Sequence, residues 1–298
     1  MSDCSQLLCR KVPPEGGFNL TVAYMQQLFA TGQTQQSVRL FSTPIPDAIL
    51  HTADSKERNW LAQLRLIFKP HQCHTVDSKY NDAPSLETYL QDYYGSLRLP
   101  PESGLLQRLD YGTAGLLLQS PDLETHTQLR ALQTQGRIKK FYGAWSPVLV
   151  PAAELPKCGQ YPGYFRSHGP KGREVRIVKS PNPTHSKKRP LVGPYRTRIE
   201  HAYSTVSGCY FAISLRKGFR HQVRAQLAQL GFPLCNDDIY LEAYPPFSTS
   251  CASSASIGPK AIVPRKIAPR AVDFPYLGLF ACALEIRLED YTLQFSFV

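Results

Sequence analysis

A chain of 298 residues with 42% hydrophobic and 19% charged residues has the composition of a globular protein, which excludes a disordered one. No apolar run approaches the ~20 residues that a membrane-spanning helix needs, and the first residues lack the basic region and apolar core of a secretory signal. We therefore expect a cytoplasmic, monomeric protein that has no membrane partner.

The net charge of +11 lies almost entirely in one region. Residues 166–224 contain fourteen Lys and Arg and only Glu174 and Glu200 as acids, a net +12, so the rest of the chain carries −1 from 20 basic and 21 acidic residues. Charge confined in this way is expected of a surface that binds a polyanion. A well-solvated basic face without a partner fits the same pattern, and charge alone does not separate the two.

The eight cysteines are scattered and include no Cys-x-x-Cys pair, so we expect reduced thiols that are mostly buried. His71, Cys73 and His74 are close together, but no second pair of ligands follows at the spacing of a zinc site. The chain also lacks a dinucleotide-binding fingerprint and a Walker loop. We expect neither a metal nor a cofactor.

The start of the chain predicts an appendage followed by one main domain. Residues 1–55 show little periodicity beyond a short helix over 22–29, so we assign them to an N-terminal appendage and residues 56–298 to the main domain. Residues 61–68 are rich in strand formers and are followed by Lys69 and a proline, which predicts a strand that ends in a turn.

Helical and extended patterns alternate in the middle of the chain. Apolar residues at helical spacing, with Ser85 as the N-cap, predict a helix over 85–94. A second helix is expected over 128–136, where it ends at a glycine, and a strand over 138–145. Residues 159–195 are rich in Gly, Pro and basic residues, which predicts loops and short strands.

The last third predicts a hairpin, a helix and two closing strands. Residues 195–215 alternate around a Ser-Gly turn, which predicts the hairpin. Apolar residues at i, i+4 and i+7 predict a helix within 218–230. Residues 242–275 form a Pro-, Ser- and Ala-rich basic segment that is too long for an ordinary connection, so we expect either a long functional loop or a disordered segment. A buried strand is expected over 277–286 and a last, alternating strand over 291–298.

A candidate catalytic carboxylate precedes one of the apolar segments. Arg108 and Asp110 are two residues apart, so they project to the same side of an extended chain. A turn-prone segment and a short buried strand over 116–118 follow them. A carboxylate at the mouth of a buried strand, beside an arginine, suits a nucleophile or a base. A surface ion pair is the common alternative.

Three stretches resemble, in the same order, the motifs of one enzyme family. Residues 108–115, Arg-Leu-Asp-Tyr-Gly-Thr-Ala-Gly, resemble the Arg-Leu-Asp-x-x-Thr-Ser/Ala-Gly catalytic motif of the RluA-type pseudouridine synthases. Residues 140–142, Lys-Phe-Tyr, and 218–224, Gly-Phe-Arg-His-Gln-Val-Arg, resemble that family's second and third motifs. Three ordered matches are far more specific than one. The resemblance extends over residues 67–285, except for much of 242–275.

This resemblance implies an enzyme that isomerises a uridine in RNA, either tRNA or rRNA, to pseudouridine without a cofactor. Asp110 would be the essential carboxylate, acting as a nucleophile or by removing a sugar proton. Arg224 would supply the charge that keeps Asp110 ionised, and Tyr142 would stack on the base and is a candidate to shuttle a proton. The implied fold is an α+β catalytic domain, a mixed and mostly antiparallel sheet flanked by helices and loops.

The resemblance also implies a set of substrate-binding residues. Arg108 would help fill the space left by the extruded base, and Thr113 belongs to the first motif. His221 and Gln222, in the first turn of the following helix, would support the pocket. Lys69 matches a strand-Lys-Pro element that lies close to the active site. The basic region would bind phosphates, so the affinity for RNA should depend on salt.

The sequence departs from the family pattern in its second half. Phe219 replaces the first arginine of the third motif, which predicts a different contact with the substrate at this position. Residues 231–240 resemble the family's Gly-His-Pro-Ile-x-Gly-Asp-x-x-Tyr, with Phe232 and Asn236 in place of histidine and glycine. Phe280 stands where a histidine is usual in the final Leu-His-Ala strand.

Two other functions stay open on the sequence. One is a non-catalytic RNA-binding protein on the same scaffold, in which Asp110 has no chemical role. The other is a hydrolase that uses Asp110 with a histidine such as His221, although no nucleophile-elbow signature supports it.

Overall fold

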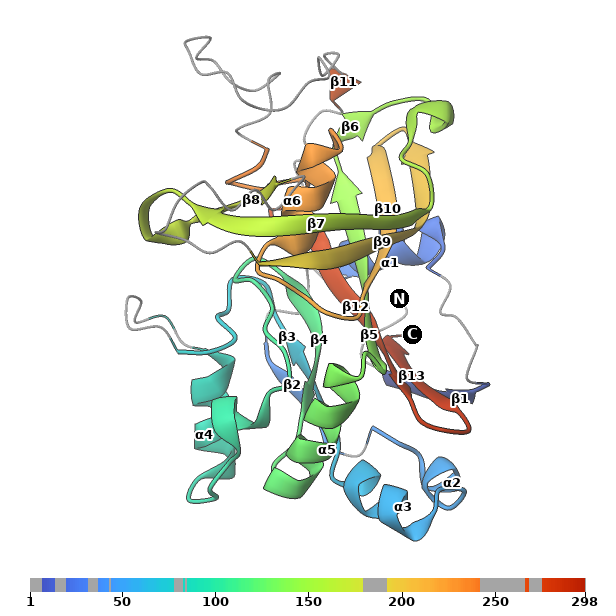
Figure 1. Cartoon of the computed structure of the whole chain (residues 1–298), viewed down its shortest axis with the longest axis vertical. Coiled ribbons are helices and arrows are strands. Elements are labelled where there is room, and N and C mark those ends of the chain that lie inside the picture. Colours follow the sequence, from blue (N-terminus) through green and yellow to red (C-terminus); the bar gives the residue numbers. More distant parts are fainter. Residues whose placement is uncertain are drawn as a thin grey trace. The chain divides into compact units, whose positions relative to one another are not determined.

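The computed structural model describes residues 7–13, 20–31, 37–42, 44–77, 83, 85–178, 192–241, 266–267 and 275–297. The chain forms two compact units, and strand β5 (Ile138–Ser146) passes from one into the other (Figure 1). Unit 1 comprises residues 1–142 and 279–298, and unit 2 comprises residues 143–278. Both units combine strands with helices, so the predicted α+β class is confirmed.

Unit 1 is built on a mixed sheet. Besides the first half of β5, its elements are β1 (Leu7–Val12), α1 (Val22–Thr31), β2 (Arg39–Phe41), α2 (Asp47–Leu50), α3 (Ser55–Ala62), β3 (Arg65–Lys69), α4 (Leu86–Tyr94), a 3-10 helix (Pro101–Gly104), β4 (Ala114–Gln119), α5 (Leu123–Thr134), β12 (Leu279–Arg287) and β13 (Thr292–Phe297). β3 pairs antiparallel with β2 and β4, β4 pairs parallel with β12, and β12 pairs antiparallel with β13. β4 thus lies between β3 and β12, and all of its residues are buried.

Part of the N-terminal segment adds strands to this sheet. β1 runs antiparallel along β13, and β2 pairs with β3. Tyr24 of α1 donates a hydrogen bond to the carbonyl of Phe297 at 2.9 Å. These contacts tie the start of the chain to its end, while the predicted boundary after residue 55 stays a prediction.

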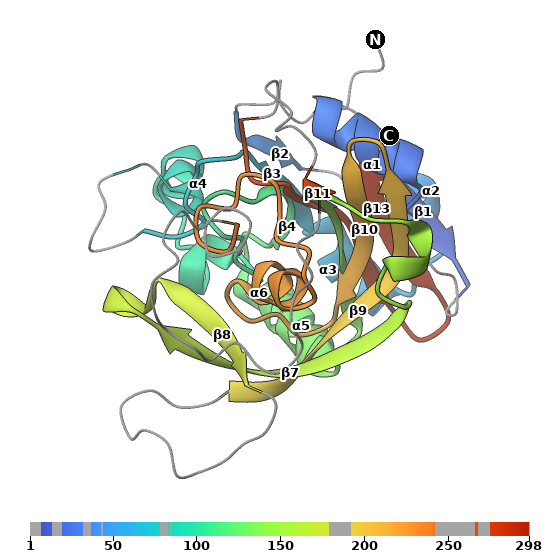
Figure 2. The same ribbon diagram turned by 90° about the horizontal axis from the view of Figure 1, so that it is seen from above.

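Unit 2 is an antiparallel sheet that curves around one helix. Besides the end of β5, its elements are β6 (Val148–Leu149), a 3-10 helix (Ala152–Glu154), β7 (Gly159–His168), a 3-10 helix (Pro170–Gly172), β8 (Glu174–Val178), β9 (Val192–Thr205), β10 (Gly208–Leu215), α6 (Gln222–Gln229) and β11 (Lys266–Ile267). The strand order is β5-β10-β9-β7-β8, and β11 pairs with β6. Figure 2 shows α6 on the inner side of the curve made by β7, β9 and β10.

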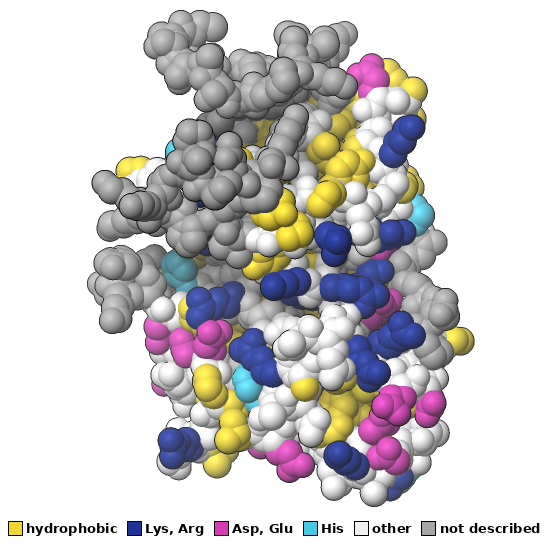
Figure 3. All heavy atoms as spheres, in the orientation of Figure 1, with side chains coloured by type: hydrophobic (Ala, Val, Ile, Leu, Met, Phe, Trp, Pro, Cys, Tyr) yellow, Lys and Arg dark blue, Asp and Glu magenta, His cyan; other side chains and the backbone are white. Residues whose placement is uncertain are grey.

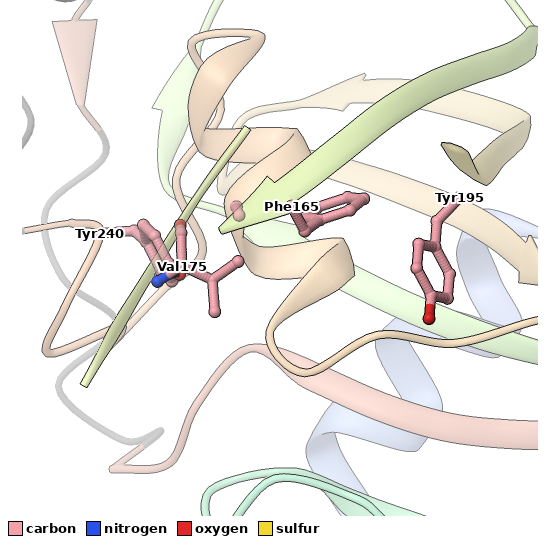
Figure 4. Close-up of a cluster of buried hydrophobic side chains, with 5 residues drawn as sticks. Phe165, Val175, Tyr195 and Tyr240 are labelled. Atoms are coloured by element: carbon pink, nitrogen blue, oxygen red, sulfur yellow. Dashed lines mark hydrogen bonds between the residues drawn. The ribbon is translucent and has the colours of Figure 1, made fainter. Parts of the chain in front are cut away.

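An apolar cluster joins α6 to the strands of unit 2. It consists of Phe165 of β7, Val175 of β8, Tyr195 of β9, Ala225 of α6 and Tyr240 (Figure 4). The Tyr240 hydroxyl donates to the carbonyl of Val175 and accepts from its amide, both at 2.9 Å. Because a buried phenol needs such partners, these bonds fix the segment after α6 against β8.

Most of the predicted elements are confirmed. α1 and α4 match predicted helices, and Ser85 accepts a hydrogen bond from the Thr88 amide at 3.0 Å as the predicted N-cap. β4, β5, β12 and β13 match predicted strands, and β9 with β10 forms the predicted hairpin. Of the segment 242–275, only residue 275 and the two residues of β11 belong to the described part. None of the helices in the described ranges has the length and apolar character needed to cross a membrane.

Three predictions are wrong in part. The strand predicted over 61–68 begins only at Arg65, because its first residues finish α3, a helix that Asp54 caps. The helix predicted over 128–136 starts earlier, at Leu123, where Asp122 is the N-cap. The Gly- and Pro-rich region contains β7, a strand of ten residues. Pairing with both β8 and β9 outweighs the low strand propensity of its Gly and Pro.

Candidate active site

Asp110 lies at the end of an extended stretch that leads into β4. Thr75 pins this stretch, because its hydroxyl donates to the carbonyl of Leu109 at 2.8 Å and accepts from the Leu109 amide at 3.0 Å. The amide of Thr113 donates to the carbonyl of Asp110 at 3.0 Å and closes the turn before β4. The backbone is therefore held on both sides of Asp110, which is itself partly exposed.

Lys69, at the end of β3, is fully buried against this turn. Its ammonium donates to the carbonyls of Cys73 at 2.7 Å, Pro70 at 3.0 Å and Tyr111 at 3.4 Å. Burial lowers the pKa of Lys69 to about 8, and its interactions with Cys73 and Asp110 oppose that shift. Lys69 thus holds the residue after Asp110 and places a positive charge in range of the carboxylate. Its contact with the substrate stays a prediction.

His71 holds the next residue of the turn. Its Nδ1 donates to the carbonyl of Gly112 at 2.7 Å. Burial lowers the pKa of His71 to about 4, the hydrogen bond to Gly112 opposes this shift, and the charge of Lys69 adds to it. The imidazole is therefore neutral at pH 7. Phe280 packs edge-on against His71, with 6.3 Å between ring centroids, and at 5.8 Å from Phe68, so it belongs to the aromatic core of unit 1.

Tyr142 comes from β5 and lies within electrostatic range of Asp110. The residue is buried, with 7% of its surface exposed. Burial raises the pKa of the Tyr142 phenol well above its ordinary value, and electrostatic interactions with Asp110 and Cys282 raise it further. The structure thus brings Asp110 and Tyr142 together and keeps the phenol protonated at neutral pH. The chemical role of each stays a prediction.

Thr113 and Arg108, the other candidate residues of the first motif, differ in environment. Thr113 is buried, and its Oγ1 has no hydrogen-bond partner among the described residues. Arg108 is exposed and forms a two-point ion pair with Glu102, with Nε–Oε2 at 3.1 Å and Nη2–Oε1 at 2.6 Å. Arg108 would have to leave Glu102 before it could fill the space of an extruded base.

In unit 2, Arg224 is held by a buried acidic partner, Asp237. Nε and Nη2 of Arg224 donate to the two carboxylate oxygens of Asp237, both at 2.8 Å, and Nη2 also donates to Asp238 at 3.2 Å. The guanidinium carbon lies 5.5 Å from the ring centre of Tyr240. Arg224 and Asp110 belong to different units, so the pairing between them stays a prediction.

His221 is the N-cap residue of α6. The prediction that it lies in the first turn of this helix is therefore wrong by one residue. His221 adopts a left-handed φ of 56°, which is uncommon for a residue with a side chain. Its Nδ1 lies 3.3 Å from the Tyr240 hydroxyl. Burial lowers the pKa of His221 to about 3, and the charges of Arg224 and Arg220 lower it further, so the ring is neutral at pH 7. A substrate-binding role for His221 stays a prediction.

Gln222 and Phe219 secure the start of α6. The Gln222 side chain accepts from the Phe219 amide at 2.9 Å and donates to the Thr197 hydroxyl at 3.0 Å. Phe219, which replaces the family's arginine, packs on the rings of Phe165 and Tyr195, with centroids 5.4 and 5.3 Å apart. The replacement therefore extends the apolar cluster of unit 2. A contact between Gln222 and the substrate stays a prediction.

The sequence did not single out Thr75, His71 or Asp237 as supporting residues of the site. Asp237 lies in the stretch that resembles the family's Gly-Asp-x-x-Tyr, so a signal existed, but its partner Arg224 is 13 residues away and only the fold brings the two together. Thr75 and His71 act on backbone groups of a distant turn, and such contacts leave no local pattern in the sequence.

Lys140, two residues before Tyr142 on β5, is a buried cation, and its burial should lower the free energy of unfolding. Side chains two apart on a strand point to the same side, and only 7% of Lys140 is exposed. Burial lowers the pKa of Lys140 to about 8, whereas an unfolded lysine titrates near ~10.4. The unfolded chain therefore binds more protons between these values, and the contribution of Lys140 to stability rises with pH in that window.

We expect Lys140→Met to raise the free energy of unfolding at pH 7 by roughly 2–3 kcal/mol, because the variant has no charge to bury. The gain should shrink as the pH rises toward ~10.4, because the wild-type lysine is then neutral in the folded state and loses its proton in the unfolded state as well. Urea unfolding at pH 7 and pH 10 measures both values. Lys139→Met is the control, since Lys139 is partly exposed and lies over the Phe141 ring. An equal gain at the two pH values would contradict this account of Lys140.

Comparison with known proteins agrees with the motifs. The chain is 23% identical over 214 residues to an uncharacterized RNA pseudouridine synthase, YjbO, of Bacillus subtilis (strain 168), a match that covers 70% of this chain and 65% of that protein. It is 26% identical over 221 residues to ribosomal large subunit pseudouridine synthase D of Nitrosomonas europaea, covering 74% of this chain and 57% of that protein. The chain thus spans about three fifths of the length of these curated relatives.

Among solved structures, human RNA pseudouridylate synthase domain containing 4 is similar over 78% of this chain and 84% of that chain, with 20% sequence identity and a TM-score of 0.48. The family described as RNA pseudouridylate synthase matches residues 52–229, which is more than half of this chain. Residues 108–115, which resemble the family's catalytic motif, lie inside the matched range. The chain belongs to the RNA pseudouridylate synthase family and is of the RluA type.

Proposed function

We propose that this chain converts specific uridines in RNA to pseudouridine, with Asp110 as the essential carboxylate. The observation that carries the proposal is that Asp110 lies within electrostatic range of two buried side chains of unit 1, Tyr142 and Lys69. An ionised carboxylate is costly to desolvate unless positive charge or hydrogen bonds compensate it, and Lys69 supplies a charge in range. The turn that carries Asp110 is pinned, as preorganised catalysis requires.

The proposed reaction breaks one bond of the substrate and forms another. The glycosidic bond from C1′ to N1 breaks, the uracil turns, and a bond from C1′ to C5 forms. C5 loses its hydrogen to water while N1 gains a proton, so the atoms balance without an oxidant or a group donor. Asp110 would start the reaction as a nucleophile or by removing a sugar proton, and Tyr142 would stack on the uracil.

Arg224 is proposed as the cation that faces Asp110 when RNA is bound. The two hydrogen bonds that its guanidinium donates to Asp237 fix the plane of that group, and bidentate pairs of this kind restrict orientation strongly. Such a fixed guanidinium would hold the Asp110 carboxylate ionised and oriented without having to be ordered during the reaction.

The basic region is the proposed binding surface for RNA phosphates. Arg176, Arg196 and Arg198 of β8 and β9 are exposed. Figure 3 shows Lys and Arg side chains gathered on the face that carries β7 and β9. Lys187, Lys188 and Arg189 lie outside the described residues. Both tRNA and rRNA are candidate substrates, and the relatives named for the large ribosomal subunit make its rRNA the first substrate to test.

A transcribed rRNA with tritium at C5 of its uridines tests the proposal. Pseudouridine formation displaces that hydrogen, so tritium should appear in water in proportion to the pseudouridine found after digestion. A non-catalytic RNA-binding protein would release no tritium. A hydrolase would release free uracil instead of pseudouridine. Either of these outcomes, if it is found with every rRNA and tRNA substrate tested, would overturn the proposed activity.

A further inference from the structure

Tyr111 presents an exposed aromatic ring directly after Asp110. The residue is 45% exposed, whereas Leu109, on the other side of Asp110, is 8% exposed. The Tyr111 ring packs against the imidazole of His74, with centroids 4.6 Å apart and planes at 38°. An aromatic side chain that is left this open next to a reactive group offers a flat apolar surface to a ligand.

The Tyr111 ring is held in place because hydrogen bonds fix both its own backbone and the backbone of His74, on which the ring packs. Its own carbonyl accepts from the buried Lys69 ammonium at 3.4 Å, and the carbonyl of the next residue accepts from His71. On the other side, the carbonyl of His74 accepts from the amide of Leu86 at 2.8 Å, which ties His74 to the first residue of α4. Binding to a surface that is already ordered loses less conformational entropy.

We propose that Tyr111 stacks on the base next to the target uridine and so helps to bind the RNA, whichever base that is. This inference rests on the proposed function. Turning a uridine out of its stack leaves the neighbouring base with one exposed face. Tyr142 is buried and would take the target base, while Tyr111 is exposed beside Asp110, so its ring suits the neighbour. Base-on-aromatic stacking accepts every base and is strong enough to change affinity about tenfold or more.

Binding of a short RNA isolates this contact. The probe is a fluorescein-labelled oligomer of twelve uridines, and the comparison is the same oligomer with abasic riboses, which keeps the phosphates and removes the bases. Fluorescence anisotropy gives the affinities of the full chain, with Asp110→Asn in every protein so that no turnover occurs. Tyr111→Ala should weaken binding of the uridine oligomer about tenfold or more and leave binding of the abasic oligomer unchanged. Tyr111→Phe keeps the ring and should bind both oligomers as the parent does.

Tyr93→Ala is the matched control. Tyr93 is a tyrosine of the same unit with 56% of its surface exposed, and it stacks on Tyr89 of α4. Its removal should change neither affinity. The inference is overturned if the parent protein binds the two oligomers equally, if Tyr111→Ala weakens both to the same degree, or if Tyr93→Ala has the same effect as Tyr111→Ala.

The test separates this inference from the proposed function. Because every protein carries Asp110→Asn, the binding result does not depend on chemistry. A positive binding result with no pseudouridine formed by the wild-type chain would leave the stacking surface standing and remove the proposed activity. If the wild-type chain forms pseudouridine but Tyr111→Ala has no base-dependent effect on binding, the proposed activity stands and the stacking surface is removed.

Discussion

Replacing Asp110 with asparagine should reduce pseudouridine formation at least about 10²- to 10⁴-fold, the range that a positioned acid, base or nucleophile contributes. Asparagine has nearly the same size but neither attacks a sugar carbon nor accepts its proton. The backbone contacts from Thr75 and Thr113 do not involve the carboxylate, so the turn should keep its shape. Tritium release from uridine-labelled rRNA under single-turnover conditions measures the loss.

Asp92→Asn is the matched control for that experiment. Asp92 is an exposed aspartate of α4 in the same unit, so its replacement removes one negative charge without touching the turn. Its rate should stay within twofold of the wild type, and far-UV circular dichroism should show that both variants are folded. An Asp110→Asn rate within tenfold of the wild type would remove Asp110 from the mechanism.

Replacing Asp237 with asparagine should lower the free energy of unfolding by about 3–5 kcal/mol, the usual cost of breaking a buried ion pair from one side. The Asp237 carboxylate accepts from Arg224 twice and from the amides of Ile239 and Tyr240, each at 3.0 Å. Asparagine leaves the buried guanidinium without its counter-charge. Urea unfolding followed by circular dichroism gives the difference.

Asp238→Asn is the control for Asp237, because Asp238 contacts the same guanidinium but its side chain is 65% exposed. Its loss should cost no more than about 1 kcal/mol. If Asp237→Asn does not fold, the paired change Arg224→Met with Asp237→Leu should recover much of the stability, since it removes both buried charges. Equal effects of the two asparagine substitutions would contradict the assigned importance of the buried pair.

The local part of the fold could be read from the sequence. The helix over 85–94 has its own N-cap, Ser85, and its own apolar stripe, and the strand at β4 has a continuous apolar run over 116–118. Such signals act over a few residues and do not depend on the rest of the chain. The chain-order match of the motifs likewise pointed to Asp110 and Tyr142, which the fold then brings together in unit 1.

The parts that the sequence did not reveal depend on contacts between distant residues. β7 is rich in Gly and Pro, and it is a strand because two neighbours pair with it. β1 gains its partner from the other end of the chain. Lys69 was expected near the substrate, but its full burial and its hydrogen bonds to backbone carbonyls become visible only when the turn after Asp110 is folded over it. Strand pairing and side-chain-to-backbone contacts of this kind carry little local signal.

The central claim, that the Asp110 carboxylate makes pseudouridine in RNA, is tested most directly in cells that lack this chain. Pseudouridine is mapped at single-nucleotide resolution in total RNA after the gene is deleted and after it is restored as wild type or as Asp110→Asn. We predict at least one site that disappears on deletion, returns with the wild-type chain and stays absent with Asp110→Asn. Recovery of that site by Asp110→Asn, or a map that deletion leaves unchanged, would contradict the claim.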